Sequence, residues 1–86
     1  MRYNNLTVNT SAVQVPIGEG DAPVLVNSGT TNIYFGNTDD VTSSNGILLA
    51  PGIGYEFART LTEAGWDALW VVSNATGGEV RYGSVG

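Results

Sequence analysis

The sequence contains no cysteine, no histidine and no lysine. Without cysteine and histidine it can form neither a disulfide nor a thiolate or imidazole metal site. The same absences exclude Ser-His-Asp and Cys-His catalysis, and the lack of lysine removes a general base and a Schiff-base amine. Carboxylates are the main side chains left that could act in catalysis. We therefore expect a non-enzymatic protein that needs no cofactor.

Charge is also scarce, and most of it is negative. Only 13% of the residues are charged, and three arginines face eight acidic residues, which gives a net charge of -5. Arg2, Arg59 and Arg81 lie far apart in the chain and form no basic run. Phosphate backbones are bound by clustered cations, so a nucleic-acid partner is not expected, and an acidic membrane surface would repel this chain.

Long apolar runs are absent as well. No stretch approaches the roughly 18 apolar residues of a membrane span, and the N-terminal residues lack the apolar core of a secretory signal. We therefore expect a protein made in a cytoplasm with no membrane partner.

A single domain of 86 residues buries only a modest share of its surface. Oligomerisation or docking on a larger assembly would add stability, although a marginally stable monomer is the alternative.

Short β-favouring runs separated by Gly, Pro and Asn dominate the sequence. The expected strands are 3–8, 11–15, 23–28, 31–36, 47–50, 54–61, 67–73 and 79–85. They predict an all-β fold, a small β-sandwich or jelly-roll-like barrel of about seven to eight short antiparallel strands. Residues 22–86 are expected to form its core. Residues 1–21 are more polar, and either an N-terminal arm that orders on a partner or the first strands would fit them.

Two hairpins are predicted from short connections between strands. Ser28-Gly29-Thr30 is too short for a crossover, so strands 23–28 and 31–36 are expected to pair, with Val26 opposite Ile33. Gly77-Gly78 is expected to join strands 67–73 and 79–85 in the same way.

The segments 54–61 and 67–73 carry most of the aromatic residues. In the first, alternation predicts that Tyr55 and Phe57 meet the core and that the strand emerges near Arg59. The second is apolar on both faces, which predicts a central strand with Trp70 in the core. A helix from Thr62 to Ala75 is the competing interpretation, which Gly65 and the β-branched Val71-Val72 pair disfavour.

Two features could carry binding chemistry. The oxygen-rich loop 36–46 contains Asp39 and Asp40 and would suit Ca²⁺, but it lacks the order of an EF-hand loop, and ordinary turn capping explains its composition equally well. Trp66 follows Gly65 in an expected turn and is the better candidate for an exposed aromatic contact, including stacking on a sugar ring. Pairs among the remaining carboxylates could in principle hydrolyse glycosides, but any acidic protein offers such pairs.

Several of these pieces occur in a distinctive order. A strand ending in Asn27-Ser28-Gly29 leads to Ile33-Tyr34-Phe35-Gly36, then to Asp40-Val41-Thr42, Leu48-Leu49-Ala50-Pro51-Gly52 and Asp67-Ala68-Leu69-Trp70-Val71-Val72, with Val80-Arg81-Tyr82 last. In this order the chain resembles small β-rich structural proteins of tailed bacteriophages over about residues 22–86.

The resemblance implies a virion protein made in the host cytoplasm. It would decorate and cement the capsid surface by binding the major capsid protein between neighbouring subunits, as a homo-oligomer and most often a trimer. The alternative is a tail or fibre module that binds host carbohydrate or a tail partner. Our candidate partner contacts are Arg2 and Tyr3 on the arm, Asp39 and Asp40 in their loop, and Trp66.

Overall fold

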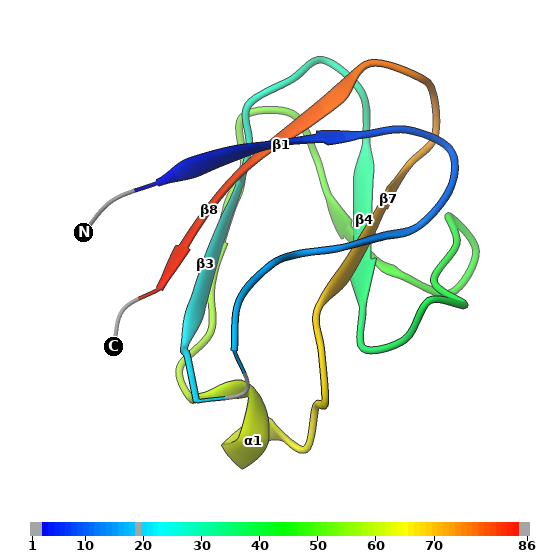
Figure 1. Cartoon of the computed structure of the whole chain (residues 1–86). Helices are drawn as coiled ribbons and strands as arrows, with labels where there is room; N and C mark the ends of the chain where they lie inside the picture. The colour runs from blue at the N-terminus through cyan, green and yellow to red at the C-terminus, as the bar shows by residue number, and fades with distance from the viewer. Residues whose placement is uncertain (1–2, 19, 85–86) are drawn as a thin grey trace.

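The computed structural model describes residues 3–18 and 20–84, and their fold is all-β. The predicted small sandwich is confirmed, with eight strands in two antiparallel sheets (Figure 1). The strands are β1 (Asn4–Val8), β2 (Val13–Gln14), β3 (Pro23–Asn27), β4 (Ile33–Gly36), β5 (Ile47–Leu49), β6 (Gly54–Glu56), β7 (Trp70–Ser73) and β8 (Gly78–Ser84). A single helical turn, α1 (Leu61–Ala64), lies between β6 and β7.

The strand order is that of a jelly roll. One sheet, called sheet A below, has the order β1-β8-β3-β6, and the other, sheet B, has the order β2-β7-β4-β5. Consecutive strands therefore mostly alternate between the sheets, and β4 with β5 is the one sequential pair that shares a ladder among the described residues. This arrangement is the double-sheet solution that all-β chains use to bury one face of each sheet.

Both predicted hairpins are wrong. Strand β3 pairs with β6 and β8, so Val26 lies opposite Gly54 and Arg81 rather than Ile33. Strand β7 pairs with β2 and β4, whereas β8 pairs with β1 and β3. Each short connection crosses from one sheet to the other instead of reversing within a sheet. The short length of a connection does not by itself distinguish a hairpin within one sheet from a connection between two sheets.

The segment after β6 also differs from the prediction. The strand ends at Glu56 rather than continuing to 61, and Thr60 then caps α1 with a capping box to Glu63. Gly65 ends the helix in the left-handed conformation, with φ of 80°. Glycine adopts this conformation without steric cost, which explains why the helix stops after one turn. Strand β7 starts only at Trp70, but it is central in sheet B as predicted.

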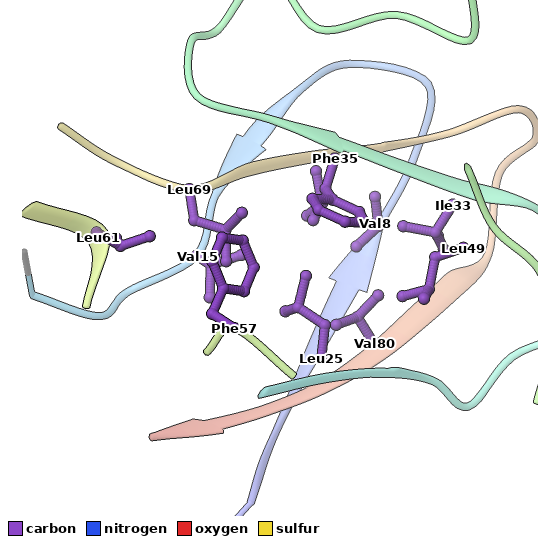
Figure 2. Packing of buried hydrophobic residues seen from close by; sticks show 11 residues of the cluster. Val8, Val15, Leu25, Ile33, Phe35, Leu49, Phe57, Leu61, Leu69 and Val80 are labelled. Carbon is purple, nitrogen blue, oxygen red and sulfur yellow. The ribbon is translucent and has the colours of Figure 1, made fainter. Parts of the chain in front are cut away.

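The core lies between the sheets and includes residues of all eight strands or their immediate neighbours (Figure 2). Its buried members are Val8, Val15, Leu25, Ile33, Phe35, Leu49, Phe57, Leu61, Leu69, Val71 and Val80. Val8 and Val15 belong to the first part of the chain, for which the sequence left an arm and first strands both open. Strands β1 and β2 lie at the edges of the two sheets.

Candidate interaction surface

The predicted contact residues come from separate parts of the molecule. Tyr3 directly precedes β1 and is 47% exposed, and Arg2 lies outside the described residues. Asp39 and Asp40 are exposed in the loop between β4 and β5. Trp66 lies in the connection from α1 to β7. Within the part of the chain that the structure describes, no hydrogen bond or ring contact joins any two of these residues.

Trp66 packs onto the core and is partly buried. Its ring centroid lies 5.3 Å from that of Phe57, in a T-shaped arrangement, and 6.4 Å from that of Phe35. Trp70 is partly exposed, and the register places it on the outer face of sheet B, beside Gly36. The expected roles of the two tryptophans are therefore reversed, because the chain after α1 turns Trp66 inward before β7 begins.

Hydrogen bonds within the loop between β4 and β5 account for its polar composition. The Asn45 side chain accepts from the Thr42 amide at 2.7 Å and donates to the Asp40 carbonyl oxygen at 3.2 Å. Val41 is only 6% exposed, and a Cβ on Gly46 would lie 2.8 Å from both Tyr34 Cβ and Val41 Cγ2. The loop is thus packed against the outer face of sheet B. No group of three or more acidic, histidine or cysteine residues suited to a metal occurs among residues 3–18 and 20–84.

The pKa of the Glu63 carboxyl is perturbed, and the cause is structural. Hydrogen bonds from the backbone and side chain of Thr60 lower the pKa of the exposed Glu63 carboxyl below its usual value. The Thr60 N–H and the Thr60 hydroxyl each donate to Glu63 Oε1 at 3.1 Å. The first of these bonds is half of the capping box, and the other half is the bond from Glu63 N to Thr60 Oγ1 at 3.2 Å. The shift therefore reports helix capping and not an acid-base site.

One surface feature was not predicted from the sequence, a group of exposed apolar side chains around β5 and β6. Most of the large hydrophobic side chains that are exposed belong to one short stretch around β5 and β6: Ile47 at 48%, Leu48 at 54%, Ile53 at 53% and Tyr55 at 44%. We call these residues the β5–β6 seam. Strands β5 and β6 are edge strands of sheets B and A, respectively, and are joined by residues 50–53.

The seam is where the core reaches the surface between the two sheets. Phe35 lies opposite Ile47 in the sheet B ladder, and its ring centroid is 5.2 Å from that of Tyr55, which belongs to sheet A. Ile47 and Tyr55 therefore flank the same buried ring from opposite sheets. Because nothing beyond these edge strands covers them, about half of each side chain remains in solvent.

The two sheets also differ in charge. The strands of sheet B contain no charged residue, whereas sheet A contains Glu56, Glu79 and Arg81. The register of sheet B puts Tyr34, Leu48 and Val72 side by side on its outer face. Val72 is only 5% exposed and the loop between β4 and β5 packs beside Tyr34, so the open part of this face is its edge at Leu48. An exposed apolar edge on uncharged strands is typical of a protein-binding surface and not of a site for ionic ligands.

No protein-family model matches this chain, and neither a curated protein nor a solved structure matches it. The described part of the chain contains no helix long and apolar enough to cross a bilayer. The function is therefore inferred from the sequence patterns and from the geometry of the chain itself.

Proposed function

We propose that this chain is a structural protein of a tailed-bacteriophage virion that decorates the capsid and cements neighbouring capsid subunits. The observation that carries the proposal is the β5–β6 seam, an exposed apolar surface on a small, otherwise well-packed jelly roll. Apolar patches of this kind on small proteins mark surfaces that bind other proteins. The order of sequence motifs supplies the virion context, and the jelly-roll fold, which occurs in viral capsid and lectin domains, is compatible with it by analogy.

The proposed mechanism is thermodynamic and involves no covalent chemistry. A protein that binds assembled subunits but not free ones stabilises the assembly by mass action. Many copies on one lattice add their individual contributions, so each copy can bind weakly. The partners are the major capsid protein and further copies of this chain, with a trimer as the favoured oligomer. A low density of surface charge suits this role, because such contacts require little desolvation of ions.

Particles with and without the protein test the cementing role. We expect particles that lack it to release DNA at a lower temperature, and purified protein added back should restore the heat resistance. Equal heat lability of the two kinds of particle would contradict cementing. The number of copies per particle is the second measurement, because hundreds fit decoration whereas a few tens or fewer would indicate a tail or fibre protein.

A further inference from the structure

We infer that the β5–β6 seam is a self-association surface on which a second copy of this chain docks. The inference rests on the proposed function, since it names the surface through which the decorating copies would associate with one another. It is drawn from the seam's exposure, area and charge and from the contrast with the opposite side of the sandwich.

The two lateral sides of the sandwich are built differently. On one side, the edge strand β1 presents the polar residues Asn4, Asn5 and Thr7, and β2 is only two residues long and is soon followed by Pro16. Short strands, polar side chains and proline are the usual protection of a sheet edge against pairing with another chain. On the other side, β5 and β6 are also short, but three of their exposed side chains are Ile47, Leu48 and Tyr55, and Glu56 at the end of β6 is their one charged residue. This second side therefore has much less polar protection.

The seam has an appropriate area for the centre of an interface. With about 200 Å² for a large side chain, the half-exposed Ile47 and Tyr55 at the gap between the sheets present roughly 200 Å². Leu48, on the outer face of sheet B, and Ile53, in the connecting loop, add about as much again. A stable interface of standard size takes about 800 Å² from each partner, and a little over half of that area is apolar. The seam would therefore supply the apolar centre, and the polar residues of the neighbouring loops would form the rim.

Charge favours a second copy over a basic partner. No charged residue occurs in the sequence between Asp40 and Glu56, and this stretch includes the whole seam. Two copies that each carry a net charge of -5 repel one another in most orientations. They can meet at the seam without placing like charges in the centre of the contact. A basic partner would find no counter-charge there.

A second copy would also complete the core. Ile47 and Tyr55 are half exposed although they flank Phe35, which is 1% exposed and lies at the centre of the core cluster. Docking of the same surface from another copy would bring these two side chains into an apolar contact that continues the core. Closed assemblies of identical subunits commonly arise from such complementary patches.

The test measures the oligomeric state of the purified chain by sedimentation equilibrium over a wide range of concentrations, without particles. We expect the wild type to self-associate. Leu48→Asp and Ile53→Asp, each placing a charge in the seam, should weaken association by about 100-fold or more. Asn5→Asp is the matched control, because Asn5 is exposed on β1, the edge strand on the opposite side, and the change adds the same charge outside the seam. It should associate like the wild type, and circular dichroism should show that all variants are folded.

Two results would overturn the inference. One is a wild type that stays monomeric at all concentrations, and the other is association that both seam variants retain. Binding of each variant to particles is measured separately, so the failure of self-association is distinguished from the failure of the capsid role. A monomeric wild type whose seam variants lose particle binding would reassign the seam to the capsid surface. Wild-type association without any particle binding would leave the seam assignment standing and contradict the proposed function.

Discussion

The two ends of the sandwich are held together in different ways. One end of the sandwich, called the polar end here, lies opposite α1 (Figure 1). Its loops β3–β4, β5–β6 and β7–β8 are fixed by side-chain hydrogen bonds. At the helix end, Phe57, Leu61 and Leu69 hold α1 and the neighbouring loops by apolar packing (Figure 2). The polar end therefore depends on the hydrogen-bonding groups of particular residues, whereas the helix end depends on the volume of its apolar side chains.

Asn27 is the centre of the polar end. It is fully buried, and its Nδ2 donates to the carbonyl oxygens of Thr31 at 2.7 Å and Leu49 at 2.8 Å, while its Oδ1 accepts from the Gly29 amide at 3.1 Å. Its backbone N–H and C=O bond the turn after β5, at Ile53 and Gly52. One residue therefore ties a strand of sheet A to the end of an edge strand of sheet B.

The helix end should show the largest loss on truncation. Phe57→Ala removes a ring that packs against Phe35, Tyr55 and Trp66, and we expect it to lower the free energy of unfolding by about 3–5 kcal/mol. Phe57→Leu keeps most of the volume and should cost under about 1.5 kcal/mol. Urea unfolding followed by tryptophan fluorescence measures both. Equal costs would show that this end depends on more than volume.

At the polar end, a large and a small apolar replacement of the same residue should cost about equally, because hydrogen bonds and not volume are lost. Asn27→Ala and Asn27→Leu both leave the Leu49 carbonyl without its partner, so each should cost about 2–3 kcal/mol, with little gained from the larger side chain. The same urea experiment measures the two variants. A leucine variant as stable as the wild type would remove the distinction between the ends.

Close packing at the polar end predicts intolerance of a single added methyl group. A Cβ on Gly78 would lie 2.7 Å from the Val8 carbonyl oxygen and 2.8 Å from the hydroxyls of Ser73 and Thr31. We expect Gly78→Ala to cost about 1–3 kcal/mol. Gly20→Ala, in the loop that precedes β3, is the control because nothing lies within 4 Å of the added atom. Its melting temperature should match that of the wild type or exceed it slightly.

The capping box at the helix end should have the smallest effects. Thr60→Ala removes the N-cap of α1 and should cost about 1 kcal/mol, whereas Thr60→Ser should retain most of that stability. Thermal unfolding at neutral pH measures the difference. A cost as large as that of Phe57→Ala would mean that capping, and not packing, holds this end.

The capping box also predicts a weak pH dependence. Because the pKa of Glu63 is lowered in the folded state, its contribution is present above the unfolded pKa and is lost as the pH falls through the folded one. Glu63→Gln should reduce the difference between the melting temperatures at neutral and strongly acidic pH. The carboxyl is fully exposed, so we expect a small change. An unchanged pH profile would contradict this role of Glu63.

The positions of the strands could be predicted from the sequence because the signals are local. Alternation and turn residues lie within each segment, so all eight strands fall inside the expected ranges, except that β8 begins one residue early. Pairing is not local. The connections at 28–32 and 74–77 look like hairpin turns, but the bonds that hold them come from Asn27, Ser73 and Asn9. All three of these residues bond to segments distant in the sequence. No short-range pattern contains that information.

The interaction surface could not be predicted for a related reason. Ile47-Leu48-Leu49 is apolar on both faces and therefore resembles a buried strand. Its exposure depends on β5 being the edge of sheet B, which is a property of the whole topology. Trp66 shows the converse case, since the preceding Gly65 suggested an exposed turn and the tertiary packing buried much of the ring against Phe57.

The position of β8 has a consequence for how the chain reaches this structure. The last strand in chain order lies between β1 and β3, so sheet A has no continuous ladder until residues 78–84 have been synthesised. Strand β1 must wait for it, whereas the β3–β6 ladder and all of sheet B contain only residues that precede β8. Such non-local pairing is slow, because loop closure precedes the contacts that stabilise it. Until β8 has been synthesised, the nascent chain would therefore leave β1 unpaired and sheet A incomplete, and its few charges give little protection from aggregation.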